Sequence, residues 1–319
     1  MRPPQNFERI NQQILRKLQS KAKSDPKSLA RRIDLSWSNW GFGQESLEKT
    51  ARRLQKNKIE WIELHGNRYG ADLGYDGKDA KKILADHGIG VAGICGMFTP
   101  DNDLSSNRGV VRQAAIDYVR RNADLGKEVG AQYMLIVPGA VGRPVKIDEF
   151  EFDRSVETLR RIAGVLVDAG IKGAVEPIRA AEVSFCFTFA DAMRYIKAVD
   201  HPGVQHINGD IYHMLAQEEH PFQAIVKHGE RLVNLHLADS SRGALGTGIL
   251  DVDALITALY VAGYNQAGHF ATPEPLGPGG DPYPAMNGKP DSATLDELVK
   301  TTADTFRARE DAVREELGV

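Results

Sequence analysis

Four side chains of the kinds that bind metal ions and transfer protons stand at the ends of successive strand-like segments. Glu176 follows the run GAV and Glu274 follows FATP, and between them in the chain come Asp210 and His236. Each carboxylate alone is as often a helix cap or an ion-pair partner as a ligand. Converging carboxylates, however, repel one another unless a cation or protons compensate their charge. Together the four side chains predict one site for a divalent metal ion, with Glu176, Asp210, His236 and Glu274 as its ligands.

The donor types narrow the choice of metal. Three carboxylates and one imidazole, without a cysteine, suit Mn²⁺, Co²⁺ or Mg²⁺ better than a structural zinc site, and Zn²⁺ stays open. We take Mn²⁺ as the first choice. An ion that holds a carbonyl oxygen and a neighbouring hydroxyl stabilises the negative charge that develops when a proton leaves the carbon beside the carbonyl. The site therefore suits proton abstraction next to a carbonyl.

Strand-like and helix-like segments alternate eight times from residue 33 onward. The strand-like segments cover residues 33–37, 60–64, 90–95, 132–137, 173–176, 204–210, 232–236 and 268–274. The helix-like segments cover residues 45–57, 79–87, 109–129, 147–169, 188–199, 221–227, 252–262 and 292–316. This alternation predicts a parallel sheet of the α/β class, closed into a single (β/α)8 TIM barrel. Active sites of such barrels lie at the carboxyl ends of the strands, which is where the four candidate ligands stand.

The first 32 residues form a separate segment with an amphipathic pattern. The apolar residues at helical spacing are Phe7, Ile10, Ile14 and Leu18. We expect an N-terminal helical extension over residues 1–32 and a barrel catalytic domain over residues 33–319. Packing against the outside or bottom of the barrel is the favoured role of the extension; contact with a partner chain and targeting stay open.

Bulk properties exclude several classes of partner. The formal net charge of −3 gives no electrostatic reason to expect nucleic acid or an anionic membrane surface. Two cysteines, Cys95 and Cys186, are too few for a disulfide framework and indicate a reducing compartment. The sequence has no apolar run long enough for a bilayer and no secretory core at its start. We therefore expect a cytoplasmic protein that binds neither nucleic acid nor membrane.

Three further residues keep fixed intervals from the candidate ligands. Glu182 lies six residues after the first ligand, His213 three after the second and Arg242 six after the third. With the four ligands, this pattern resembles the xylose isomerase-like TIM barrel superfamily, and within it the D-tagatose 3-epimerase group. The resemblance covers the chain from residue 33 to about residue 290. It rests on seven residues at matching intervals, which is far more specific than any one pair.

The resemblance implies a role for each of these residues. All four ligands would bind one metal ion, and Glu176 and Glu274 would also act as acid and base on opposite faces of a bound sugar. Glu182, His213 and Arg242 would hydrogen-bond the hydroxyls around the reacting carbon. Structural interpretations remain beside these: a turn cap for His213, a solvated loop charge for Glu182, and an ion pair for Arg242. The implied activity is that of a metal-dependent sugar isomerase or epimerase that works through an enediolate.

Two positions beside the substrate differ from the ketose epimerases. The chain reads Glu176-Pro-Ile-Arg-Ala180 where those enzymes have an asparagine, and Pro275-Leu276 stands where an aromatic residue is common. The chain also resembles inosose dehydratases and the larger subunit of C-glycoside deglycosidases, which act on 3-oxo-glycosides with a small β-rich partner. The alternative is therefore a metal-dependent lyase on a keto sugar or 3-oxo-glycoside. Expected partners are a small carbohydrate and either further copies of this chain or a small second subunit.

Two residues after the early strands are candidates for substrate contacts. Trp40 offers a ring that could stack on a sugar, and His65 is a spare base, although a single histidine at a strand end is more often structural. Two other classes of protein are compatible with a barrel of this kind. An apurinic endonuclease shares the barrel but needs a histidine-rich metal cluster and a basic face. The sequence shows neither feature. A sugar-binding barrel without catalysis stays open, but the presence of both acid/base carboxylates argues against it.

Overall fold

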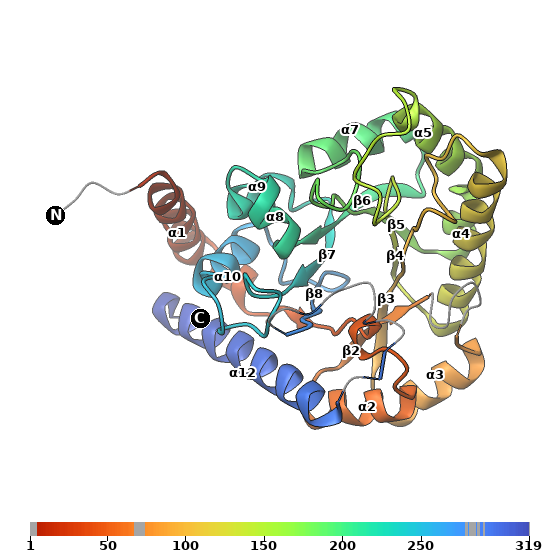
Figure 1. Ribbon diagram of the computed structural model, residues 1–319. Coiled ribbons are helices and arrows are strands. Elements are labelled where there is room, and N and C mark those ends of the chain that lie inside the picture. The colour runs from red at the N-terminus through yellow and green to blue at the C-terminus, as the bar shows by residue number, and fades with distance from the viewer. Residues whose placement is uncertain are drawn as a thin grey trace.

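The computed structural model describes residues 5–66, 74–277, 280, 285, 288–289 and 291–318 of the 319-residue chain. Within these residues eight parallel strands form the wall of a barrel, and helices surround it (Figure 1). The strands are β1 (Asp34–Leu35), β2 (Trp61–His65), β3 (Gly90–Cys95), β4 (Tyr133–Ile136), β5 (Lys172–Val175), β6 (Val204–Asp210), β7 (Leu232–Leu237) and β8 (Phe270–Pro273).

The strand order is that of a single barrel. From β2 to β8, consecutive strands pair with each other, and β1 pairs with β8. Between β1 and β2 the barrel closes through a parallel bridge that joins Ser38, three residues after the end of β1, to Glu63 in the middle of β2. All six residues of β7 are buried, as expected for a parallel strand that has helices on one side and the barrel interior on the other. The predicted (β/α)8 fold is confirmed.

The helices follow the strands in the predicted order. They are α1 (Asn6–Ser24), α2 (Leu47–Lys56), α3 (Gly77–Asp86), α4 (Gly109–Val129), α5 (Glu151–Ile162), α6 (Gly164–Ala169), α7 (Phe189–Val199), α8 (Ile211–Gln217), α9 (Pro221–His228), α10 (Val252–Val261) and α12 (Ser292–Leu317), with short 3₁₀ turns at Pro26–Leu29 and Trp40–Phe42. No helix in the described part of the chain is both long and apolar enough to span a membrane.

Two helical details differ from the sequence pattern. The segment predicted as one helix over residues 147–169 is two helices, α5 and α6, that meet at Ala163 and Gly164. Glycine lowers helix propensity, which explains the break at this point. The second detail is α8, which starts directly after Asp210 and is not among the helix-like segments predicted from the sequence.

The N-terminal helix α1 packs on the outside of the barrel, beside α10 (Figure 1). Ile14 and Leu18 are buried there, and Nζ of Lys21 donates a hydrogen bond to the backbone oxygen of Tyr260 at 3.1 Å. Phe7, predicted on the apolar face, is 54% exposed. Residues 1–4 of the predicted extension lie outside the described residues. The contacts agree with the favoured packing role of the extension.

The last helix, α12, runs along the outside of the barrel between α10 and α2 (Figure 1). Its Glu310 is fully buried and accepts hydrogen bonds from the backbone N–H of Ile33 at 2.8 Å and the hydroxyl of Tyr260 at 3.0 Å. Arg307 donates to the other carboxylate oxygen at 2.6 Å. This carboxylate therefore ties the start of β1 to the helices that cover the closing strands.

Candidate active site

Asp210 lies where β6 ends and α8 begins, and its two carboxylate oxygens have different surroundings. Oδ1 accepts the backbone N–H of Tyr212 at 2.8 Å and caps α8. Oδ2 is buried and accepts no hydrogen bond from the described residues, although Nε2 of His213 lies 3.3 Å away. Burial raises the pKa of Asp210; His213 opposes the rise, and Glu274 adds to it. One side chain thus serves as a helix cap and still offers an oxygen to a ligand.

His236 lies at the centre of the site, at the end of β7. Its Nδ1 is 3.2 Å from Oε1 of Glu176 and 3.5 Å from Oε2 of Glu274. Its Nε2 is 3.0 Å from both carboxylate oxygens of Glu63. Burial alone would lower the pKa of His236, but the charges of Glu274 and Glu63 outweigh burial and raise the pKa well above its ordinary value. Positive charge is therefore strongly stabilised at this position.

Glu176 follows β5 and is buried. Its Oε1 accepts a hydrogen bond from Nδ2 of Asn208 at 2.9 Å. Burial raises the pKa of Glu176 to about 7; the hydrogen bond from His236 opposes the rise, and the charges of Asp210 and Glu274 add to it. A carboxyl group that titrates near neutral pH is well suited to accept and release protons.

Glu274 follows β8, and each of its carboxylate oxygens has a donor. Nε1 of Trp40 donates to Oε2 at 2.5 Å, and the guanidinium of Arg242 donates to Oε1 at 3.1 Å. The same guanidinium lies 5.3 Å from the ring centre of Trp40 and 4.9 Å from that of Tyr212. Arg242 thus pairs with a candidate ligand. Its backbone has a φ of 59°, a left-handed conformation that costs energy for a residue other than glycine.

The donors at the centre of the site fit a divalent cation. Glu176, Asp210 and His236 each offer one ligand atom, and these atoms all lie within 4.8 Å of one another. The buried Oδ2 of Asp210 and the crowded carboxylates would both be compensated by a cation. Glu274 adds a further carboxylate beside the same nitrogen of His236. Oxygen and imidazole donors without thiolate are typical of Mn²⁺ and similar ions.

The three residues expected to contact hydroxyls lie around these donors. His213 is on α8, and burial lowers its pKa to about 4, so the ring is neutral. Glu182 is buried and accepts a hydrogen bond from Nε of Arg179 at 2.5 Å, which excludes the solvated loop charge. Arg179 in turn donates to the hydroxyl of Tyr212 at 2.8 Å. Arg179 and Tyr212 were not singled out from the sequence.

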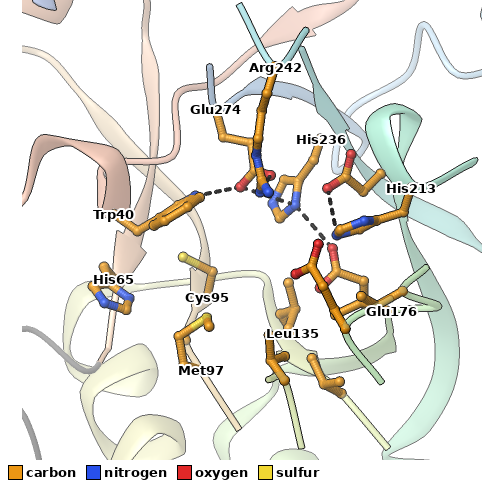
Figure 2. Close-up of a pocket in the computed structure, with 16 residues that line it drawn as sticks. Trp40, His65, Cys95, Met97, Leu135, Glu176, His213, His236, Arg242 and Glu274 are labelled. Atoms are coloured by element: carbon orange, nitrogen blue, oxygen red, sulfur yellow. Dashed lines mark hydrogen bonds and ion pairs between the residues drawn. The ribbon is translucent and has the colours of Figure 1, made fainter. Parts of the chain in front are cut away.

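All the predicted site residues line one pocket, with an empty volume of about 500 Å³ that includes its open mouth. They are Trp40, His65, Glu176, Glu182, Asp210, His213, His236, Arg242 and Glu274. Most of the remaining lining is a group of apolar side chains, which we call the apolar wall: Cys95, Met97, Leu135, Val137, Val141 and Ile178. Figure 2 shows Cys95, Met97 and Leu135 across the pocket from Arg242 and Glu274. The pocket is thus polar on one side and apolar on the other.

His65 lies on the side of the pocket away from Glu176 and His213 (Figure 2). Its backbone N–H donates to Oδ1 of Asn39 at 2.9 Å, and Asn39 donates to the hydroxyl of Tyr75 at 2.8 Å.

A fully buried carboxylate, Glu63, is the main feature that sequence reasoning missed. The available signal was its spacing, because Glu63 stands two residues before His65 on β2 and alternate residues of a strand share a face.

Beneath the site, Asn208 and Asn234 form a hydrogen-bonded pair at 2.7 Å, and each stands two residues before a candidate ligand.

The comparison with protein families agrees with this geometry. The family described as xylose isomerase-like TIM barrel matches residues 51–287 of the chain. The chain belongs to this family. The matched range contains every predicted site residue except Trp40, and the predicted family is confirmed.

Among the proteins similar to this chain in sequence are sugar epimerases. Ketose 3-epimerase of Arthrobacter globiformis is 28% identical over 193 residues, which are 60% of this chain and 66% of that enzyme, just under two thirds of its length. The 3-dehydro-D-guloside 4-epimerase of Escherichia coli (strain K12) is 28% identical over 241 residues, 73% of this chain and 89% of that enzyme. The names of these relatives are consistent with a sugar epimerase or isomerase.

A solved structure of L-ribulose 3-epimerase has the same fold. It is 21% identical in sequence, its TM-score is 0.78, and the match covers 90% of this chain and 97% of that one. The likeness supports the barrel and the course of its strands.

Proposed function

We propose that this protein is a divalent-metal-dependent sugar isomerase or epimerase. The observation that carries the proposal is the approach of two carboxylates, Glu176 and Glu274, to the same nitrogen of His236, at 3.2 and 3.5 Å. Proton transfer at a carbon beside a carbonyl needs one group that removes the proton and one that returns it. The names of the two sequence relatives, a ketose 3-epimerase and a 4-epimerase of a 3-dehydro sugar, support this class of reaction.

Glu176, Asp210, His236 and Glu274 are the proposed metal ligands, and Mn²⁺ is the proposed ion. When bound, the cation would polarise the substrate carbonyl and stabilise the negative charge of the enediolate. Its positive charge would also offset the repulsion among the buried carboxylates, which is what raises the pKa of Glu176 besides burial itself.

Glu176 and Glu274 carry out the two proton transfers. One carboxylate removes the proton from the carbon beside the carbonyl, and the C–H electron pair moves into the enediolate. The other carboxyl group returns a proton to the opposite face of the same carbon, which inverts it. Trp40 and Arg242 hold both oxygens of Glu274, so that this carboxylate keeps one orientation during the exchange.

The polar side of the pocket would orient the sugar. Arg242 is buried and remains charged, because Glu274, Asp210 and Glu182 raise its pKa against the effect of burial. A buried guanidinium favours the oxygen on which negative charge develops. His213 is neutral and would exchange hydrogen bonds with a hydroxyl, and Glu182 would accept one. The face of a sugar ring that carries C–H groups fits the apolar wall.

A lyase acting on a keto sugar or 3-oxo-glycoside is the second candidate, and the apolar wall favours it. Six apolar side chains line a pocket that a small polyhydroxy ketose would fill with hydroxyl groups. A glycoside would place its apolar aglycone there instead. The E. coli relative is named for a 3-dehydro-guloside, which is itself a glycoside. In the lyase reaction the enediolate expels the substituent on the adjacent carbon in place of taking up a proton.

One experiment separates these functions. The purified protein is loaded with Mn²⁺ and incubated in D₂O with ketoses, inososes and 3-oxo-glycosides. Incorporation of one deuterium at the inverted carbon, with no group lost, supports the epimerase. An unsaturated product, or activity that depends on a small copurifying subunit, supports the lyase. If the Mn²⁺-loaded protein catalyses neither exchange nor elimination with any of these substrates, the proposed function is wrong.

A further inference from the structure

Glu63 is a buried carboxylate to which the proposed chemistry gives no task. It lies in the middle of β2 and its exposed fraction is 0%. It is not among the described residues that line the pocket, so it does not contact a substrate there. Because a charged group away from water is costly unless it is paired, the partners of Glu63 indicate what it does.

The main partner is His236. Both oxygens of Glu63 lie 3.0 Å from Nε2 of the imidazole. The other ring nitrogen, Nδ1, faces Glu176 and Glu274 in the pocket. The ring therefore stands between the buried carboxylate on one side and the candidate metal site on the other. When a cation displaces the Nδ1 proton and Nε2–H stays donated to Glu63, the lone pair of Nδ1 is directed into the site.

Glu63 is itself held from several sides. The hydroxyl of Tyr133 on β4 donates to Oε1 at 2.6 Å, and Nδ2 of Asn234 on β7 donates to the same oxygen at 3.2 Å. The backbone N–H of Glu63 donates to the oxygen of Trp37 at 2.9 Å, and its carbonyl accepts the N–H of Asn39 at 3.2 Å. These contacts fix both the chain and the carboxylate, so that Glu63 is a rigid acceptor for the imidazole.

We propose that Glu63 is a positioning residue that accepts the Nε2 proton of His236 and thereby presents Nδ1 as the metal-binding atom. The inference rests on the proposed metal site. A carboxylate on the far nitrogen of a ligating histidine fixes the tautomer and the ring orientation and makes the ligand more basic. Loss of such a partner typically weakens metal binding by 10- to 100-fold, on the order of the effect expected here.

The test uses Glu63→Gln in the full chain. Glutamine keeps the shape, and its amide oxygen still accepts one hydrogen bond, but the negative charge is gone. We expect the Kd for Mn²⁺, measured by calorimetric titration of the metal-free protein, to rise by roughly 10- to 100-fold. The matched control is Glu310→Gln, since Glu310 is equally buried but lies on α12, where it accepts the backbone N–H of Ile33. That change lowers the melting temperature and leaves the Kd for Mn²⁺ unchanged.

Two further measurements keep the test decisive if Glu63→Gln does not fold. Tyr133→Phe removes one hydrogen bond to Glu63 but keeps its charge, so we expect a smaller rise in the Kd for Mn²⁺. In wild-type protein labelled with ¹⁵N-histidine and loaded with diamagnetic Zn²⁺, nuclear magnetic resonance should find the proton of His236 on Nε2. A proton on Nδ1 in the loaded protein would overturn the proposal.

The outcomes separate the inference from the proposed function. If Glu63→Gln binds Mn²⁺ within about twofold of the wild type, or if Glu310→Gln loses as much affinity, the positioning role of Glu63 is wrong. Neither of these two outcomes contradicts the proposed metal site. If wild-type protein takes up neither Mn²⁺ nor Zn²⁺, the proposed metal-dependent function fails, and the role of Glu63 fails with it.

Discussion

Trp40 and Glu274 lie 234 residues apart in the chain, and the indole N–H of Trp40 donates a hydrogen bond to Oε2 of Glu274 at 2.5 Å. The other oxygen of Glu274 accepts a hydrogen bond from Arg242. The short 3₁₀ turn after β1 and the loop after β7 thus fix the carboxylate that follows β8. This arrangement is possible because β1 and β8 are neighbours in the closed barrel.

Replacing Glu274 by glutamine tests its proposed acid/base role. We expect Glu274→Gln to keep the fold and to lower kcat by at least about 100-fold, which is typical for loss of a general acid or base. The melting temperature of the metal-free protein should not fall, because one of several crowded carboxylates loses its charge. Circular dichroism and deuterium exchange measure the two effects. Turnover close to that of the wild type would count heavily against the role.

Replacing Trp40 by phenylalanine isolates one hydrogen bond. Phenylalanine keeps an aromatic ring beside Arg242 but removes the indole N–H. Since a hydrogen bond to a charged group contributes about 1.5–3 kcal/mol, we expect kcat to fall by roughly tenfold or more. Trp37→Phe is the control, because Trp37 is buried against Phe42 in the same loop. Equal losses in the two variants would mean that the loop, and not the hydrogen bond, matters.

The sequence was sufficient for the barrel, and the nine residues that it indicated for the site all line one pocket, although the apolar wall was not foreseen. Parallel strands of a barrel end on one rim, so Glu176, Asp210, His236 and Glu274 had to lie near one another once the eight repeats were recognised. Their roles as metal ligands stay a prediction. The double use of Asp210, as the cap of α8 and as a source of a buried oxygen, was missed because cap and ligand were treated as alternatives.

Partners from distant strands were harder to predict. Glu63 stands inside a strand whose apolar neighbours give it the appearance of an ordinary core segment, and only the closed barrel brings it to Nε2 of His236. The pairing of Arg242 with Glu274, and of Glu182 with Arg179, likewise depends on loop conformations that spacing alone does not fix. Hydrophobic periodicity predicts the faces of strands but not the direction of long side chains in loops.

The apolar wall gives a prediction about substrate preference. Leu135→Asn places a polar amide in the wall, and burial of an apolar group against a leucine is worth about 1.5–3 kcal/mol. If an aglycone occupies the wall, KM for a 3-oxo-glycoside with a phenyl group should rise by roughly tenfold or more, while KM for a free ketose changes little. Steady-state kinetics on both substrates measure the difference. Equal changes on the two substrates would show that the wall does not contact an aglycone.

His206 on β6 provides a test of pH dependence away from the site. Burial lowers its pKa to about 4, and the positive charges of Lys172, Arg231 and His269 add to the shift. In the unfolded chain the pKa is near its ordinary value, so the unfolded state takes up the proton first as pH falls. The wild type should therefore lose stability from about pH 6.5 down to about pH 4 through this group.

The variant His206→Asn removes that loss. Urea unfolding at pH 7 and at pH 4.5 should show that the free energy of unfolding falls less in the variant than in the wild type over this interval. A difference between the two proteins that is the same at both pH values would contradict the assignment.

In the proposed site, Glu176, Asp210, His236 and Glu274 share one divalent ion. The most direct test is an anomalous difference map from crystals of the wild-type protein grown with Mn²⁺. We predict a single strong peak within bonding distance of the three carboxylates and of Nδ1 of His236. Full Mn²⁺ occupancy elsewhere in the protein, or no peak between these four side chains at saturating Mn²⁺, would contradict the account.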